Sequence, residues 1–108
     1  NKEHGNCIIF CTCPNQEVAQ VIASTLVKQS LAACVNISAK VQSIYKWQDE
    51  IQYDDEILLL IKSRYQLFDR LEQVILELHP YELPEIIAVS IETANKNYLQ
   101  WLDQNCIE

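Results

Sequence analysis

The pattern of apolar and polar residues predicts four strands, of which the second is long and bent. Short apolar runs rich in Ile, Val and Leu are typical of buried strands. They occupy residues 7–12, 32–37 together with 41–47, 56–62 and 86–91. Residues 38–40 interrupt the second run, which predicts one long strand with a bend or two strands. The polar residues 48–55 are expected to form the tip that leads back to the third strand.

Apolar residues recur at helical spacing after the first strand, after the third strand and near the C-terminal end. Asn15 can cap the first helix, whose apolar side begins at Val18. Residues 63–66 have the S-x-x-Q form of a capping box and predict the start of a second helix, which ends before Pro80. A short helix over residues 95–105 follows the fourth strand.

This order of elements predicts an α+β fold of the ferredoxin-like type, βαββαβ, with an extended hairpin and a C-terminal helix. One antiparallel sheet then carries two helices on one face. The runs at 7–10, 57–61 and 86–89 are apolar on both faces, so the face without helices must also be covered. Because the terminal helix is too short to cover four strands, we expect an obligate oligomer in which the long hairpin pairs between subunits.

Length and charge restrict the possible partners. The 108 residues, 49% of them hydrophobic, predict a single domain over 7–108 after a flexible start at 1–6. The formal net charge is -7 and the basic residues are scattered, so nucleic acid is not an expected partner. The apolar runs are far below the roughly 20 residues that span a bilayer, and the polar start has no apolar signal segment. We therefore expect a cytoplasmic protein with no membrane partner.

The five cysteines predict reduced thiols, because an odd number without a C-x-x-C pair fits neither a disulfide framework nor a closed zinc site. Cys7, Cys11 and Cys13 share the same parity in the first predicted strand and should point to one face. All except Cys11 are expected to act as small buried hydrophobic residues: Cys7, Cys13, Cys34 and Cys106.

The segment HPYELPE at residues 79–85 contains the only internal histidine, since His4 lies in the polar start. Pro80 and Pro84 fix φ and bias the residues before them towards extended conformations. The loop therefore loses little entropy on binding, which predicts a pre-organised site. The same prolines also suit a simpler role, in which one ends a helix and the other begins a strand.

Five motifs in order together resemble the CutA divalent-cation tolerance family. They are LAACVNI at 31–37, SIYKW at 43–47, EILLLIKS at 56–63, HPY with PE at 79–85, and YLQW at 98–101. Cys11 and Thr12 extend the resemblance to the first strand. The resemblance implies a ferredoxin-like fold, a tight homotrimer formed through the sheets, a cytoplasmic location in bacteria and a link to copper tolerance.

The resemblance also implies metal ligands. In bacterial members discussed as copper binders, a cysteine in the first strand and two adjacent histidines before Pro-Tyr act as ligands. The cysteine corresponds to Cys11 and the second histidine to His79, whereas Leu78 replaces the first. Thiolate and imidazole suit copper, as Cu2+ or Cu+, and sulfur favours the cuprous form. Two side chains do not complete such a site, so water, another subunit, Glu85 or Cys13 is expected to contribute.

Two other functions stay open at this stage. A regulatory trimer that binds a small ligand or a protein would use a cleft between subunits, beside His79. Its lining would come from five further motif residues: Lys62, Tyr81, Glu85, Tyr98 and Trp101. An enzyme is not expected, because the chain has no Ser-His-Asp set and no Gly-rich phosphate motif, and the turn after the first strand has no Arg.

Overall fold

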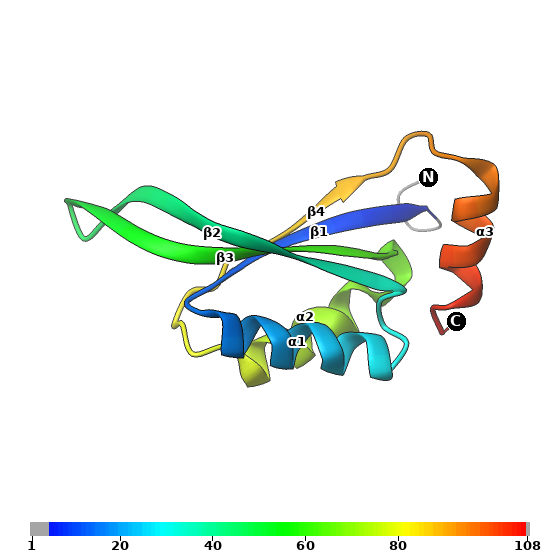
Figure 1. The fold of residues 1–108 in the computed structure, drawn as a ribbon, viewed down its shortest axis with the longest axis horizontal. Helices are drawn as coiled ribbons and strands as arrows, with labels where there is room; N and C mark the ends of the chain where they lie inside the picture. Colours follow the sequence, from blue (N-terminus) through cyan, green and yellow to red (C-terminus); the bar gives the residue numbers. More distant parts are fainter. Residues whose placement is uncertain (1–4, 108) are drawn as a thin grey trace.

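A computed structural model describes residues 5–107, which form one four-stranded antiparallel sheet and three α-helices (Figure 1). The strand order in the sheet is β2-β3-β1-β4. The elements follow one another as β1 (Asn6–Cys13), α1 (Gln16–Lys28), β2 (Cys34–Trp47), β3 (Glu50–Arg64), α2 (Phe68–Leu78), β4 (Ile86–Ser90) and α3 (Lys96–Gln104). The predicted α+β fold with its βαββαβ order and terminal helix is confirmed.

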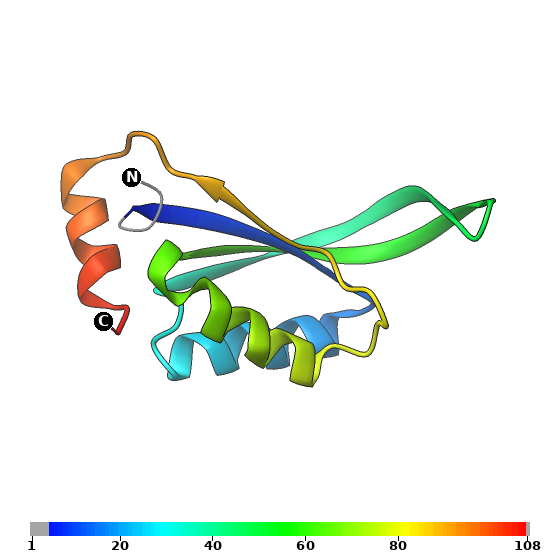
Figure 2. The same cartoon turned by 180° about the vertical axis from the view of Figure 1, so that it is seen from behind.

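The alternation of side chains in β1 gives the sheet two different faces. Cys7, Ile9, Cys11 and Cys13 are fully buried in one core with residues of α1 and α2, whereas the residues between them are only partly covered. Figures 1 and 2 show both helices on this side of the sheet. The predicted shared parity of the β1 cysteines is confirmed, and all five cysteines are free thiols.

The opposite face, which we call the open face, is apolar but carries none of the described helices. Pairing in the sheet places Phe10 beside Leu60 and Ile87, and Ile8 beside Val89. Ile87 and Val89 are 50% and 45% exposed in the single chain. Apolar side chains that are contiguous and exposed on one sheet face are typical of an interaction surface. This is the face that the sequence predicts to be covered by other subunits.

The hairpin of β2 and β3 is longer than predicted. Pairing continues to Trp47 opposite Glu50, so only Gln48 and Asp49 form the turn. Their φ angles of 51° and 67° match a tight two-residue hairpin turn. The predicted polar tip over residues 48–55 is therefore wrong beyond the turn, because an exposed ladder can carry polar side chains without losing its backbone hydrogen bonds.

The start of α2 also differs from the prediction. Ser63 still belongs to β3, and its Oγ donates a hydrogen bond to the Leu31 carbonyl at 2.6 Å. A short 3-10 helix (Tyr65–Leu67) then leads into α2 without a side-chain cap. The predicted capping box at residues 63–66 is wrong, because a buried backbone carbonyl uses the hydroxyl that the box would need.

Other predicted boundaries are confirmed. The bend at residues 38–40 is a shift of register between Ile37 and Lys40 inside one long strand. Asn15 caps α1 by accepting a hydrogen bond from the Val18 backbone N–H at 2.9 Å. The second helix ends at Leu78, directly before His79.

The predicted flexible start over residues 1–6 lies mostly outside the described residues. Asn6 is an exception, because it begins β1 opposite Arg64. Its side chain also donates a hydrogen bond of 2.8 Å to Asp103, which lies in α3. Within residues 5–107, no helix is long and apolar enough to cross a membrane.

Candidate metal site and adjoining groove

Two thiols and one imidazole form a buried cluster beneath β1, which we call the thiol–imidazole cluster. The Sγ atoms of Cys11 and Cys13 and a ring nitrogen of His79 lie within 4.8 Å of one another. Both thiols are fully buried and His79 is only 7% exposed. In the part of the chain that the structure describes, this is the one group of three or more side chains placed to hold a metal ion. Its donor set suits a soft ion such as copper.

The end of α2 brings His79 to the cluster. Pro80 biases the preceding residue away from helical geometry, and His79 is extended, with φ -85° and ψ 133°. Its backbone N–H still donates to the Ile75 carbonyl at 2.8 Å, so the last turn of α2 fixes the position of His79. The sequence prediction that Pro80 ends the helix therefore also explains why the imidazole turns back towards β1.

Both ring nitrogens of His79 are engaged in hydrogen bonds. Nε2 lies 2.7 Å from the Thr12 carbonyl oxygen, and Nδ1 lies 3.1 Å from the Tyr81 backbone nitrogen. A carbonyl only accepts and a backbone N–H only donates, so Nε2 carries the proton and Nδ1 accepts. The imidazole thus joins the loop at residues 79–85 to the strand between the two cysteines. Its ring also packs against Tyr81, with centroids 4.7 Å apart.

The two thiols influence each other. A hydrogen bond with Cys13 raises the pKa of Cys11 far above the usual range, and burial and the nearby carboxylates of Glu85 and Glu56 raise it further. The same hydrogen bond lowers the pKa of Cys13, although burial opposes this change. Cys13 is therefore more than the small hydrophobic residue expected from the sequence, and the C-x-C spacing within one strand is the signal that points to the pair.

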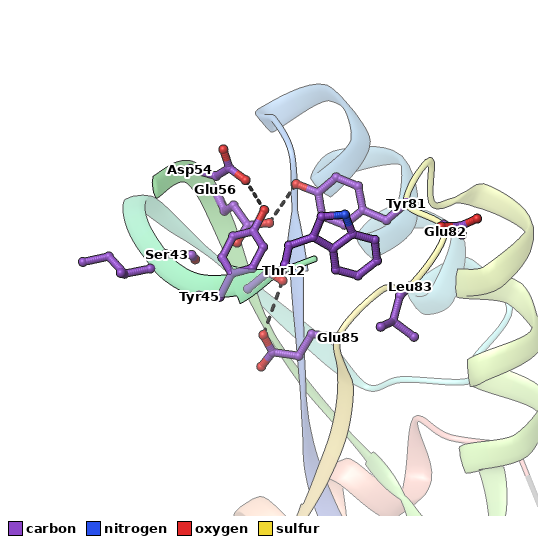
Figure 3. A pocket seen from close by; sticks show the side chains of 11 residues that line it. Thr12, Ser43, Tyr45, Asp54, Glu56, Tyr81, Glu82, Leu83 and Glu85 are labelled. Carbon is purple, nitrogen blue, oxygen red and sulfur yellow. Dashed lines mark hydrogen bonds between the residues drawn. The ribbon is translucent and has the colours of Figure 1, made fainter. Parts of the chain in front are cut away.

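A groove of about 550 Å³ adjoins the cluster, between the β2–β3 hairpin and the loop at residues 79–85 (Figure 3). Its walls include three aromatic rings and four carboxylates: Tyr45, Trp47, Tyr81, Asp54, Glu56, Glu82 and Glu85. The hydroxyl of Tyr81 donates to Glu56 at 2.7 Å, and that of Thr12 donates to Glu85 at 3.4 Å. Burial, followed by this hydrogen bond to Glu56, raises the pKa of Tyr81, so its hydroxyl stays a donor at neutral pH.

The residues predicted to line a cleft lie in three different places within one chain. Tyr81 and Glu85 line the groove, which His79 adjoins. Lys62 lies on the open face, where its Nζ donates to the Asn36 side chain. Tyr98 and Trp101 pack against each other in α3 with tilted rings, whose centroids are 5.6 Å apart. Figure 1 shows α3 at the end of the domain opposite the hairpin tip. A shared cleft between subunits stays a prediction.

Two acidic groove residues, Asp54 and Glu56, were not identified from the sequence. The sequence pattern predicts a polar tip at Asp54, and it puts Glu56 at the start of a buried strand. The signal for Glu56 is its position directly before the apolar run that starts at Ile57, because a buried carboxylate needs a donor. Its donor is Tyr81, from a loop that no local pattern connects to β3.

Comparison with known proteins identifies relatives over nearly the whole chain. The family model described as CutA1 divalent ion tolerance protein matches residues 7–105. The divalent-cation tolerance protein CutA of Thermus thermophilus is 46% identical over 98 residues, which are 91% of this chain and 95% of that protein. Human protein CutA is 44% identical over 95 residues, which are 88% of this chain but 53% of the human protein. This chain thus spans about half the length of the human relative.

A solved structure gives the same result for the fold. The crystal structure of CutA1 from Shewanella sp. SIB1 matches with a TM-score of 0.94 at 39% sequence identity. The match covers 97% of this chain and 98% of that chain. The sheet, the hairpin and the position of the terminal helix are therefore shared features rather than properties of this sequence alone.

Proposed function

This chain belongs to the CutA1 divalent ion tolerance family, and on that premise we propose that it binds copper in the thiol–imidazole cluster as part of a response to metal ions. The observation that carries the proposal is the meeting of Cys11 and His79, the two predicted ligands, with Cys13 within 4.8 Å. Thiolate and imidazole bind copper well, and the sulfur atoms favour the cuprous form. Copper is the cargo of this protein in our proposal, and no catalytic step is part of it.

We also propose that the protein acts as a homotrimer in the cytoplasm. The exposed apolar side chains of the open face support assembly, and three copies is the number that the family resemblance implies. The five free thiols suit a reducing compartment. The proposed partners are metal ions and the other copies of the chain. Neither a nucleic acid nor a membrane is among them.

Competition for copper tests the proposal. The parent and Cys11→Ser are titrated without oxygen against a chromophoric cuprous chelator, and in a second series against a cupric chelator. Cys11→Ser should lose more cuprous than cupric affinity, because only cuprous binding depends strongly on soft sulfur. Cys34→Ser is the matched control, since Cys34 is half-buried on the open face away from the cluster. Unchanged cuprous affinity in a Cys11→Ser, Cys13→Ser double variant would exclude copper binding at the cluster.

A second candidate is a regulatory trimer that binds a small ligand or a protein and has no physiological role with metals. The groove supports it, because Tyr81 and Glu85 line a hollow of about 550 Å³ with aromatic walls. Copper tolerance of cells separates the candidates. Copper binding predicts that Cys11→Ser impairs tolerance while Glu82→Gln, a change in the groove alone, does not. The reverse pattern favours the regulatory trimer.

A further inference from the structure

We propose that the thiols of Cys11 and Cys13 alone hold the metal ion, that the ion is monovalent cuprous copper, and that His79 positions the strand instead of binding. This inference rests on the proposed function, because it concerns the same cluster. It differs from the ligand pair implied by the family resemblance, in which a first-strand cysteine and the histidine before Pro-Tyr both bind. Three features of the cluster support it.

The first feature is that Nδ1 of His79 is occupied. It accepts the Tyr81 backbone N–H at 3.1 Å, and this N–H belongs to the loop that carries the imidazole itself. A metal ion at Nδ1 would have to displace the N–H, which would then be left without its acceptor. Leaving a backbone donor in a half-buried loop without its partner is costly.

The second feature is that Nε2 is not available either. It donates to the Thr12 carbonyl at 2.7 Å, so metal binding there requires its proton to leave. In a neutral imidazole the proton would move to Nδ1. Nδ1–H would then face the Tyr81 N–H, and two donors would point at each other. Binding at either nitrogen therefore breaks the same hydrogen bond between His79 and Tyr81.

The third feature is that the two sulfur atoms lie close together and make only weak thiol hydrogen bonds, Cys11 with the Thr12 carbonyl at 3.9 Å and with Cys13, which end when the thiols lose their protons to bind a metal. Both are fully buried on the same side of β1, within 4.8 Å of each other. A metal–thiolate bond is about 2.3 Å long, so one ion can contact two sulfur atoms that lie no more than about 4.6 Å apart. Cuprous copper accepts two soft ligands in this way, whereas zinc requires about four ligands.

His79 has a different role in this arrangement. Its Nε2–H holds the Thr12 carbonyl, and Thr12 is the residue between the two cysteines. The imidazole therefore fixes the backbone that sets the direction of both thiols. Outer partners of this kind orient ligands, and their loss reduces metal affinity less than the loss of a ligand.

Cuprous affinity is measured without oxygen for the parent and for Cys11→Ser, Cys13→Ser, His79→Gln, His79→Ala and Cys34→Ser, against a chromophoric cuprous chelator. Each of Cys11→Ser and Cys13→Ser should lose more than about 100-fold in affinity, because each removes one of two ligands. His79→Ala should lose about tenfold as an orienting partner. His79→Gln should stay within about threefold, because its amide keeps an N–H for the Thr12 carbonyl. Cys34→Ser should match the parent.

The outcomes separate the inference from the proposed function. If Cys13→Ser keeps its affinity while Cys11→Ser and His79→Gln both lose it, the Cys11 and His79 pair binds copper; the inference fails and the proposed function stands. If every cluster variant binds as the parent does, both fail. Tight zinc binding to the parent, lost in the same two cysteine variants, would overturn the choice of a monovalent ion.

X-ray absorption at the copper edge gives a second measurement that does not depend on any variant folding. The copper-loaded parent should show two sulfur neighbours and no scattering from an imidazole ring. An imidazole contribution would overturn the inference directly. A shell of oxygen or nitrogen without sulfur would overturn the proposed function as well.

Discussion

The two faces of the sheet are built from the same strands but differ in what completes them. On the face covered by α1 and α2, the odd-numbered residues of β1 are fully buried within the single chain. On the open face, Ile8 and Phe10 are as apolar as their neighbours but remain partly exposed. The chain itself therefore covers one face, whereas the other requires a further surface to cover it.

We expect the two faces to have different roles, with metal binding on the covered face and assembly on the open face. The covered face holds the thiol–imidazole cluster, where burial and fixed hydrogen bonds set the geometry of each side chain. The open face offers exposed apolar side chains such as Ile87 and Val89, which suit stable association more than selective binding. On this account, the proposed metal binding depends on packing within one chain, and the proposed trimer depends on the open face.

The largest effect is expected from a charge on the open face. Ile87→Asp places a carboxylate among apolar side chains of β1 and β4, so an assembled protein would have to bury an unpaired charge. Light scattering coupled to gel filtration should give three chains for the parent and no trimer for the variant. Gln20→Asp adds the same charge on the exposed side of α1 and should leave the trimer intact. A parent-like trimer of Ile87→Asp, or a well-folded parent monomer at micromolar concentration, would remove the case for assembly through this face.

A smaller but substantial loss is expected on the covered face. Ile9→Ala leaves a cavity between β1 and the two helices, and should lower the free energy of unfolding by about 2–5 kcal/mol per chain. Val27→Ala on the solvent side of α1 is the control and should change it by less than about 1 kcal/mol. The measurement is chemical denaturation followed by circular dichroism. Equal losses in both variants would mean that the covered face is not a packed core.

Trp47 tests whether the hairpin contributes to assembly. It is 39% exposed near the hairpin turn, where a large indole is costly to leave in water. Trp47→Ala should weaken association by about 2 kcal/mol, as for a buried anchor residue, and should leave copper binding per folded chain unchanged. Lys46→Ala, the neighbour on the other side of β2, is the control. Full thermal stability and assembly of Trp47→Ala would show that the hairpin is not an anchor.

The smallest effect expected is a loss of stability in alkali that comes from the covered face. Burial, with a contribution from Cys106, raises the pKa of Cys7 to about 11 from 9.0. The folded state therefore holds the thiol proton more tightly than the unfolded state, and this stability is complete below pH 9 and lost as pH rises through 11. The slope is at most about 1.4 kcal/mol per pH unit for one proton. Denaturation at pH 8, 9.5 and 10.5 should show a shallower decline for Cys7→Ala than for Cys34→Ala; equal slopes would contradict this assignment.

Much of the fold could be predicted because local periodicity carries it. The parity of Cys7, Cys11 and Cys13 in one strand identified the covered face, and Pro80 identified the end of α2. The start of that helix was wrong, because the Ser63 hydroxyl is used by a backbone carbonyl 32 residues earlier in the sequence. The hairpin tip was wrong beyond Asp49 because a polar ladder and a polar loop have the same composition.

The candidate site could be predicted only in part. Cys11 and His79 were found through the family resemblance, and Cys13 entered as one of several possible further ligands. Which nitrogen of His79 carries a proton could not be predicted, because it depends on the Thr12 carbonyl and the Tyr81 N–H, which the fold brings together from two segments. A sequence pattern identifies residue types that can bind a metal, but the availability of each donor atom depends on its other hydrogen bonds.

The most direct test of the account is an anomalous diffraction map of crystals loaded with copper without oxygen, collected on both sides of the copper absorption edge. The account predicts one peak per chain beneath β1, between the Sγ atoms of Cys11 and Cys13, with the His79 hydrogen bonds to Thr12 and Tyr81 retained. The peak should disappear in Cys11→Ser crystals and persist in Cys34→Ser crystals. Copper found only among the groove carboxylates of Asp54, Glu56 and Glu85, or no ordered copper at all, would contradict it.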